Sequence, residues 1–470
     1  MLTVPGRILV APNVQYRGNT SKKPESGSWN MHKIKFYAGA TLKSWAILVI
    51  GKEGLFDVKK ELDDIMQGFH EALRINGIDA SLARGARRID RSEIEKTFSE
   101  FGSVQTAKPE LIFVIFPKED TALYNVVKYQ GDIVHGIHTV CVVGSKFSKP
   151  GRDGYDLQYF ANVALKFNLK MGGVNQVLDS SKLGIVGEGR TMIVGIDVTH
   201  PSPGSADTAP SVAGVVASIN KNLGQWPAVL KIQDGRKEMV TDLGELFQSR
   251  LKLWRKHNGN ALPENVIVYR DGVSEGQYNT VLDAELPELR KACEGTYPPV
   301  DTKRGLPRIS IIIVGKRHHT RFYPTTIDES KIDAKSSNSK NGTIVDRGVT
   351  EARNWDFFLQ AHTALKGTAR PAHYIAVHDE IFAKRPVPEP FHNAADVLED
   401  LTHNMCYLFG RATKAVSICP PAYYADLVCE RARRYLCRFY DPDSPMAPSV
   451  SGASRDVEVH PTLADKMFYI

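Results

Sequence analysis

The sequence predicts an α/β protein with two successive sheet domains, and three observations lead to this prediction. The chain has 470 residues, which exceeds the size at which a single hydrophobic core stops growing. From about residue 45, apolar runs that suit buried strands alternate with segments of helical spacing. After about residue 185 the order changes, because three strand-like runs follow one another before the helices return.

The first 45 residues are rich in Pro, Gly, Ser and Asn, which indicates an extended linker. The region that follows, to about residue 185, predicts an α/β sandwich with a mostly parallel sheet. Its predicted strands are WAILVI, ELIFVIFP and HTVCVVG, and its predicted helices cover residues 57–76, 121–136 and 155–171.

The second region begins with TMIVGIDVTH, VAGVVASIN and WPAVLKIQD, which we expect to form an antiparallel meander. A helix over 235–257 follows, then the strand NVIVYRDG, a helix over 277–293 and the strand ISIIIVGKRHH. This order of three strands, helix, strand, helix and strand is that of the ribonuclease H fold. The polar stretch 327–350 is expected to be a loop.

The composition is typical of a soluble globular protein, with 42% hydrophobic and 24% charged residues. A net charge of +7, most of it in residues 1–190, is weak support for a nucleic-acid partner. The six cysteines form no CxxC pair, so we expect a reduced, intracellular compartment and no structural zinc. Neither a membrane span nor a signal peptide is predicted.

Four acidic residues are expected at positions where the fold could bring their side chains together. Asp197 ends the first strand of the second region and Asp271 ends its fourth, each after a mainly apolar run. Glu238 is expected at the start of the first helix there, and Asp426 near the start of a later helix. Such carboxylates can hold two divalent ions about 4 Å apart, which cleave phosphodiesters without a nucleophilic side chain. By position alone, each acid could equally be a surface residue or a helix cap.

Two pairs of residues four apart share one face of a predicted helix, Tyr124 with Lys128 and Lys166 with Lys170. Ammonium groups can neutralise a terminal phosphate, and an aromatic ring can stack on its base. A solvated lysine face with a half-buried tyrosine explains the same spacing, and the spacing alone favours this simpler interpretation.

Several segments carry a family resemblance. GIDVTHPSPGS, YRDGVSEGQY, GKRHHTRFYP, GTARPAHY and SICPPAYYADLVCERARRYL closely match signature segments of eukaryotic Argonaute PIWI domains, in order and at similar spacing. LYNVVKYQGDIVHG and ALKFNLKMGGVNQVL resemble segments of the Argonaute MID domain. The resemblance covers nearly the whole chain. It implies a linker over 1–45, a Rossmann-like MID domain over 46–185 and a ribonuclease-H-like PIWI domain over 186–470.

The resemblance implies a catalytic tetrad of Asp197, Glu238, Asp271 and Asp426, with Glu238 as the mobile acid that completes the site when a guide is loaded. Asp197, Asp271 and Asp426 are implied to bind two Mg²⁺ ions, or Mn²⁺ in their place. The fourth position is often His in animal members, and the all-carboxylate set resembles the fungal type. Water activated between the metals would leave a 5′ phosphate and a 3′ hydroxyl.

Contacts with a small guide RNA are implied as well. Those at its 5′ phosphate are Tyr124, Lys128, Lys166, Lys170 and Arg431, with the C-terminal carboxylate of Ile470 nearby. Many members add a Gln at the position of Val140, so Thr139 or His138 is expected to substitute. Those along its backbone are Arg317, His362, Arg370, Arg411, Ser417 and Tyr423. For Tyr423, a place in the core is the alternative.

The implied function is a guide-directed endoribonuclease of RNA silencing, with guide RNA and target RNA as partners, in the cytoplasm. The alternative is a non-cleaving RNA-binding scaffold that recruits silencing proteins, such as the Trp-containing partners that family members bind. No segment resembles the N-terminal or PAZ domains of the family, so we expect a fragment whose cleavage alone is weak or absent. The loop before Tyr124, with Glu119 and Asp120, corresponds to the one that selects the first base.

Overall fold

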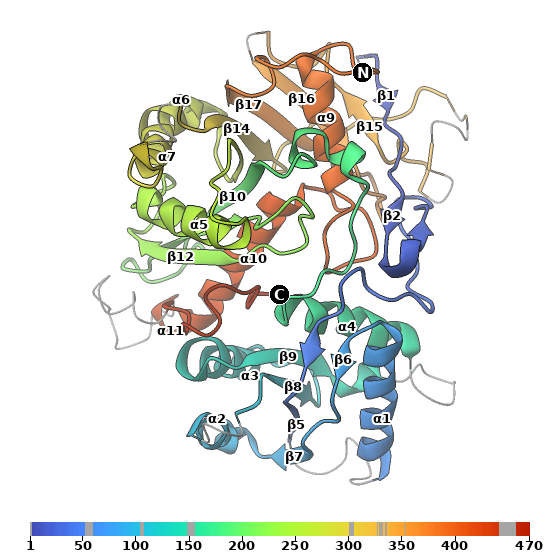
Figure 1. The fold of residues 1–470 in the computed structure, drawn as a ribbon, viewed down its shortest axis with the longest axis vertical. Coiled ribbons are helices and arrows are strands. Elements are labelled where there is room, and N and C mark those ends of the chain that lie inside the picture. Colours follow the sequence, from blue (N-terminus) through green and yellow to red (C-terminus); the bar gives the residue numbers. More distant parts are fainter. Residues whose placement is uncertain are drawn as a thin grey trace.

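The computed structural model describes residues 2–51, 60–103, 108–147, 156–299, 305–326, 328, 332–333, 336–352, 354–440 and 457–470. These residues form two main sheets, of four and nine strands, at opposite ends of the molecule (Figure 1). Helix α10 (Pro420–Tyr435) and the C-terminus lie between the two sheets. None of the described helices is long and apolar enough to cross a membrane.

The smaller sheet is entirely parallel and has the order β7-β5-β8-β9. Its strands are β5 (Trp45–Ile50), β7 (Ala86–Ile89), β8 (Leu111–Phe116) and β9 (His138–Val143), and its helices are α1 (Lys60–Ile75), α2 (Ile94–Ser103), α3 (Thr121–Tyr129) and α4 (Leu157–Lys170). Ile47 and Val49 of β5 pack on the side of α1 and α4, whereas Leu48 and Ile50 pack on the side of α2 and α3. The central strands are apolar throughout because helices cover both faces.

The larger sheet has the order β1-β15-β16-β17-β14-β13-β10-β11-β12. Its strands are β1 (Arg7–Ile8), β10 (Thr191–Thr199), β11 (Ser211–Ala217), β12 (Ala228–Gln233), β13 (Asn265–Asp271), β14 (Arg308–Gly315), β15 (Thr343–Val345), β16 (Trp355–Gln360) and β17 (Ala372–Asp379). Helices α5 (Leu243–His257) and α7 (Leu286–Glu294) cover one face, and α9 (Ala394–Met405) and α10 cover the other. The order of elements from β10 to β14 confirms the predicted ribonuclease-H-like arrangement.

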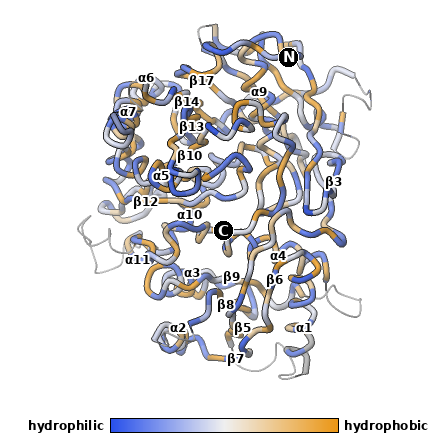
Figure 2. The backbone as a smooth tube through the Cα atoms, in the orientation of Figure 1, coloured by the Kyte–Doolittle hydropathy of each residue, from blue (hydrophilic) through white to orange (hydrophobic). Residues whose placement is uncertain are grey.

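Short elements complete the described chain. They are β2 (Val14–Gln15), β3 (Ser21–Lys22), β4 (Thr41–Leu42), β6 (Asp79–Ala80), α6 (Tyr278–Thr280) and α11 (Cys437–Tyr440). Hydrophobic stretches lie mainly along the interior strands and the inner sides of helices, as Figure 2 shows by colour.

One edge of the larger sheet collects the ends of several strands. β10, β13 and β14 are parallel and end there, with Asp271 opposite Val314. β17 begins at this edge, because Gly315 lies opposite His373. β16 ends there, next to the start of β17. The segments that follow β14 and β16 are therefore brought close to the acidic strand ends.

The helix expected over 235–257 begins later, at Leu243. Asp242 has a φ of 56°, a left-handed conformation that interrupts the helix just before its start. The Gln233 side chain accepts a hydrogen bond from the Thr241 amide at 3.0 Å and donates one to the Met239 carbonyl at 3.1 Å. Residues 234–242 are therefore a loop, stabilised by a side chain instead of by helical bonds.

Two further expectations differ from the structure because they depend on long-range pairing. Residues 7–8, expected in an extended linker, form edge strand β1, which pairs with β15. The stretch 327–350, expected to be a loop, contains β15 itself. Part of that stretch lies outside the described residues, as do the predicted helix residues 57–59 and 155.

Candidate functional site

The predicted acids of the larger sheet come together where β10 and β13 end. Asp197 lies on β10 and Asp271 is the last residue of β13. Asp426 lies in the second turn of α10, which packs directly across β10. A Cβ on Gly195 would lie 2.0 Å from the carbonyl oxygen of Pro421, so only glycine permits this close approach.

These three carboxyl groups have raised pKa values. Burial, followed by the charge of Asp271, raises the pKa of Asp197 to about 7. Burial and the charge of Asp426 raise the pKa of Asp271 to about 6, although Arg270 and Arg317 oppose this. Burial and the charge of Asp197 raise the pKa of Asp426 to about 6. Buried carboxylates that repel one another are an environment that a divalent cation relieves.

Glu238 reaches the same place from the loop before α5. Its Oε1 accepts a hydrogen bond from Arg270 at 2.9 Å, and its Oε2 lies 2.7 Å from the Nε2 of His200. A Cβ on Gly272 would lie 3.2 Å from both the Oδ1 of Asp197 and the Oε1 of Glu238. The structure therefore places Glu238 beside Asp197, although not at the start of a helix.

Arg270 and His200, which hold Glu238, were not singled out from the sequence. Arg270 is fully buried, and Glu285 accepts hydrogen bonds from its Nε and one terminal nitrogen, each at 3.0 Å. The other ring nitrogen of His200 lies 2.8 Å from the hydroxyl of Ser211. A charged residue inside the apolar strand VIVYRD was the available signal for Arg270, because such a residue is rarely buried without partners.

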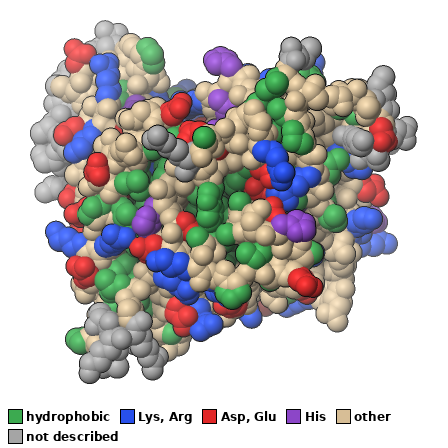
Figure 3. Space-filling view, turned by 90° about the horizontal axis from the view of Figure 1, so that it is seen from above, with side chains coloured by type: hydrophobic (Ala, Val, Ile, Leu, Met, Phe, Trp, Pro, Cys, Tyr) green, Lys and Arg blue, Asp and Glu red, His purple; other side chains and the backbone are tan. Residues whose placement is uncertain are grey.

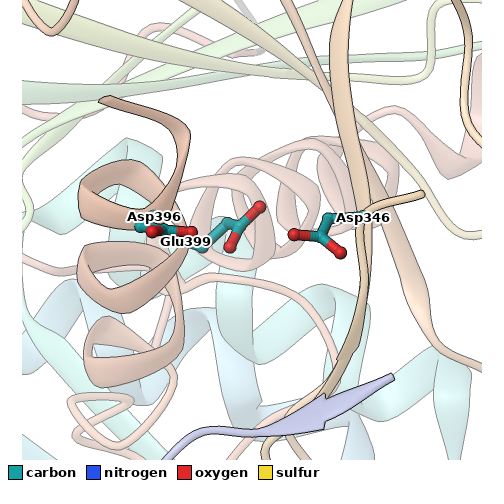
Figure 4. Close-up of side chains that lie close together, drawn as sticks. All are labelled: Asp346, Asp396 and Glu399. Carbon is teal, nitrogen blue, oxygen red and sulfur yellow. The ribbon is translucent and has the colours of Figure 1, made fainter. Parts of the chain in front are cut away.

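A second acidic cluster lies elsewhere on the larger sheet. Among the described residues, only Asp346, Asp396 and Glu399 place three ligand oxygens all within 4.8 Å of one another (Figure 4). Arg7 of β1 donates to Asp346 at 3.1 Å and to Asp396 at 2.7 Å, and it also pairs with Glu399. This cluster therefore binds a guanidinium group and fixes the edge strand. Among the described acids of the candidate tetrad, no three place their ligand oxygens all within 4.8 Å of one another.

Carboxylate oxygens are the donors that Mg²⁺ and Mn²⁺ prefer. Asp197, Asp271 and Asp426 supply them without a bound cation of their own, since no ion pair with a described Lys or Arg lies within 4.0 Å of any of the three. The residues present thus fit a site for hard divalent ions.

A cavity of about 250 Å³ lies between α3 and α4 of the smaller sheet and α10. It is lined by Tyr124, Lys128, Val140, Cys141, Lys166, Arg411, Leu427, Glu430, Arg431, Arg434, Tyr469 and Ile470. Most of the residues predicted to bind a terminal phosphate are therefore close together. Arg411, predicted along an RNA backbone, lines the same cavity. Leu427, Glu430 and Arg434 were not predicted, although their spacing on α10 places them near Arg431.

Contacts inside this cavity fix the predicted cations. The Nζ of Lys128 donates to the carbonyl oxygen and the hydroxyl of Thr139, at 2.8 and 2.7 Å, and lies 5.2 Å from the centre of the Tyr124 ring. The Tyr124 hydroxyl accepts a hydrogen bond from Arg431 at 3.2 Å. Thr139 therefore supports Lys128 from behind and does not itself line the cavity.

Two other residues predicted at the phosphate, Lys170 and His138, are buried and do not line the cavity. Lys170 is fully buried and donates to the carbonyl oxygen of Phe468 instead of lining the cavity. His138 is also buried, and neither of its ring nitrogens has a hydrogen-bond partner among the described residues. Arg431 pairs with the buried carboxylate of Asp132 at 2.6 Å. Neither His138 nor Lys170 reaches the cavity surface.

The cavity leaves positive charge uncompensated. Burial, followed by the charges of Arg411 and Lys128, lowers the pKa of Lys166 to about 8. Burial and the charge of Lys128 lower the pKa of Lys170 well below its ordinary value. Asp132 offsets only part of this charge. An anion in the cavity would relieve this repulsion and raise the pKa of Lys166.

The basic segment after β14 lies at the same edge as the acids. Lys316 donates to the hydroxyl of Ser417 at 2.5 Å, and the Nε2 of His318 lies 2.9 Å from the carbonyl oxygen of Pro371. Arg317 is exposed and close enough to lower the pKa of Asp271. His318 thus fixes the loop before β17.

The other residues predicted to contact the RNA backbone differ in how far they are buried. Arg370 is exposed. Burial, followed by the charge of Lys316, lowers the pKa of His362 to about 4, so this ring is neutral at pH 7. Tyr423 is half-buried, and its ring centre lies 4.5 Å from that of Phe409. Seen from above, charged side chains of both signs lie in small groups with hydrophobic side chains between them (Figure 3).

Comparisons with known proteins identify the family to which this fold belongs. The family model described as the Piwi domain matches residues 111–436. The chain is 35% identical to protein argonaute MEL1 of Oryza sativa subsp. japonica over 93% of this chain and 42% of that protein. It therefore spans less than half the length of that relative.

Two solved structures have the same fold over nearly the whole chain. The C-terminal lobe of a budding yeast Argonaute matches with a TM-score of 0.84 and 27% identity, covering 99% of this chain and 95% of that one. The Kluyveromyces polysporus Argonaute with a guide RNA matches with a TM-score of 0.84 and 28% identity, covering 99% and 57%. The chain belongs to the eukaryotic Argonaute family and corresponds to its C-terminal MID–PIWI portion.

Proposed function

We propose that this chain binds the 5′-phosphorylated end of a small guide RNA and cleaves the target RNA paired with it, by hydrolysis with two divalent ions. The observation that carries the proposal is that α10 contributes to both sites. Asp426 joins the carboxylates at the strand ends, and Arg431 and Arg434, one to two turns further along the helix, line the cationic cavity.

For guide binding, the cavity offers positively charged side chains and the aromatic ring of Tyr124. Lys128, Lys166 and Arg411 offer charge-assisted hydrogen bonds to a terminal phosphate. Tyr124, held by Lys128 and Arg431, offers a face on which the first base can stack. The Kluyveromyces polysporus relative, solved with a guide RNA, supports this assignment. On this proposal, residues 46–185 are the MID domain, 186–470 the PIWI domain and 1–45 the linker.

For cleavage, Asp197, Glu238, Asp271 and Asp426 would hold two Mg²⁺ or Mn²⁺ ions. Bound ions would activate the attacking water and stabilise the leaving oxygen. The chain's own part is positional: β10 and β13 fix two acids on a rigid edge, and Arg270 and His200 keep Glu238 turned toward them. The products would be a 5′ phosphate and a 3′ hydroxyl.

Along the guide, exposed Arg317 and Arg370 would contact backbone phosphates near the strand ends. Contacts of this kind hold A-form geometry without reading bases, so target choice would come from pairing. Binding should weaken as salt rises, because cations bound to the phosphates are released. Trp-containing silencing partners and a cytoplasmic location rest on the family resemblance alone.

A cleavage assay tests the proposal. The chain is loaded with a 5′-phosphorylated guide and given an end-labelled, fully paired target in Mg²⁺. A single cut is expected, slow in this chain alone, and it should be absent with Asp197→Asn or EDTA. Asp234→Ala, which removes an exposed carboxylate of the same domain, is the matched control and should cut normally. If the wild type binds guide tightly but leaves the target whole, a non-cleaving RNA-binding scaffold replaces the slicer.

A further inference from the structure

Arg411 reaches the cavity from an irregular segment, residues 407–412, that connects α9 to α10. The segment has no regular secondary structure of its own. Its position nevertheless matters, because the charge of Arg411 is the largest electrostatic influence on the lowered pKa of Lys166. Buried backbone carbonyls in such a segment need hydrogen-bond donors.

The donors come from the other side of the cavity. Asn175 and Gln176 follow α4, the helix that carries Lys166, and are 1% and 2% exposed. The Nδ2 of Asn175 donates to the Gly410 carbonyl at 2.6 Å. The Nε2 of Gln176 lies 3.4 Å from the Phe409 carbonyl and also within 3.5 Å of those of Tyr407 and Ala412.

The same segment is held from α10. The Gly410 amide donates to the hydroxyl of Tyr424 at 2.9 Å, and Tyr424 lies two residues before Asp426. Asn175 is itself fixed, because its Oδ1 accepts a hydrogen bond from Asn168 of α4 at 2.8 Å. The carbonyl of Gly410 is therefore bonded to Asn175, which follows α4, and its amide is bonded to Tyr424 of α10.

We propose that Asn175 and Gln176 are positioning residues for guide binding, because their buried amides fix the backbone that presents Arg411 to the 5′ phosphate. This inference rests on the proposed function. It predicts that removing either amide selectively weakens the recognition of the phosphate, since Arg411 would no longer be held at the cavity. Loss of packing alone would weaken all RNA binding equally.

The test compares dissociation constants for one RNA with a 5′ phosphate and with a 5′ hydroxyl, using the full chain. Asn175→Ala should weaken binding of the phosphorylated RNA about tenfold and leave the hydroxyl form nearly unchanged. Gln176→Met, which keeps the volume, should do the same to a smaller extent because its bonds are longer. Combining Asn175→Ala with Arg411→Gln should cost no more than Arg411→Gln alone.

Gln360→Met is the matched control, since it removes a buried amide that donates to the Ser339 carbonyl and is not among the residues that line the cavity. It should leave the ratio of the two constants unchanged. If Asn175→Ala and Gln176→Met keep the wild-type ratio, or if the Asn175→Ala and Arg411→Gln effects add, the positioning role is wrong. If the wild type itself shows no preference for the phosphate, the proposed guide site fails, and this inference fails with it.

Discussion

The cavity beside α4 and the carboxylate cluster at the ends of β10 and β13 share helix α10, but the charge that each leaves uncompensated has the opposite sign. The cavity is lined by five basic side chains, those of Lys128, Lys166, Arg411, Arg431 and Arg434, against the acid Glu430 and the C-terminal residue Ile470, while the buried Asp132, outside the lining, is paired with Arg431. The acids Asp197, Asp271 and Asp426 lie together near the ends of β10 and β13, with Glu238 beside Asp197. One region is therefore prepared for an anion and the other for cations.

A third cluster shows acids that a cation of the chain compensates only in part, since burial raises the pKa of Glu399 to about 8 although Arg7 opposes this. Asp346, Asp396 and Glu399 lie closer together than the candidate tetrad does, yet Arg7 pairs with all three. Buried charge that has its partner within the chain stabilises structure, whereas buried charge without one is costly to maintain. Proximity of acids alone therefore does not distinguish a candidate metal site from a structural cluster of ion pairs.

The largest effect is expected from Glu238→Gln. The amide of Gln keeps the side-chain volume but loses the charge, so the proposed metal site would lose a carboxylate and the ion pair with Arg270 would be lost. Cleavage should fall about a hundredfold or more, measured by single-turnover kinetics, with guide affinity unchanged. Equal losses of guide affinity and cleavage would mean that the two regions are not separate sites.

Metal binding should depend steeply on pH. The pKa values of about 7 for Asp197 and about 6 for Asp271 and Asp426 mean that protons compete with the ions below pH 7. The Mg²⁺ concentration for half-maximal cleavage should therefore fall about tenfold from pH 6 to pH 8.

The raised pKa values of these acids can also be checked without RNA, from the pH dependence of the stability of the metal-free protein. Between about pH 4 and pH 7 the folded protein still holds protons on these acids that the unfolded chain has already released, so metal-free stability should fall as pH rises through that range. Asp197→Asn should flatten the decline in the melting temperature. A metal-free stability that rises over this range would contradict the raised pKa values.

Binding of the 5′ phosphate should depend on pH above pH 7, whereas protons should compete with metal ions below pH 7. Since the pKa of Lys166 is lowered to about 8, its charge is lost in the free protein as pH rises from 7 to 9. Affinity for 5′-phosphorylated RNA should fall a few-fold over that range, while affinity for 5′-hydroxyl RNA stays level. Lys166→Met should remove the dependence, and a dependence that survives this change would assign it to another group.

The smallest functional effect is expected from Arg7→Ala. It leaves Glu399 buried without its cation, so the free energy of unfolding should fall by about 2 kcal/mol, less than for a fully buried pair because Arg7 is partly exposed. A thermal melt would measure this. Guide affinity and the rate of cleavage per folded molecule should not change, and a change in either would link the third cluster to the sites.

How much the sequence could predict depended on the range of the interactions. Asp197 and Asp271 could be found because an apolar run followed by an acid marks the end of a buried strand. The position of Glu238 could be expected only through the family resemblance, and its predicted helix was wrong because Gln233 and Asp242 form a loop there. Strands β1 and β15 were missed because segments of two or three residues carry no periodicity.

The cavity shows the same limit. Tyr124, Lys128 and Lys166 share helix faces that spacing reveals, whereas the roles of Asn175 and Gln176 depend on carbonyls more than 230 residues away. Thr139 was expected at the phosphate, but the structure places it behind Lys128. Contacts of this kind are set by the packing of the two sheets around α10, which no local pattern encodes.

The central claim is that one guide engages both regions at once, so the most direct measurement is the position of the cut. Because α10 ties the cavity to the carboxylates, the cut should lie at a fixed distance from the nucleotide paired with the guide's 5′ end. Moving that end by one nucleotide along the same target should move the cut by one nucleotide, and lengthening the 3′ end should leave it in place. A cut that follows the 3′ end or the target sequence would contradict the account.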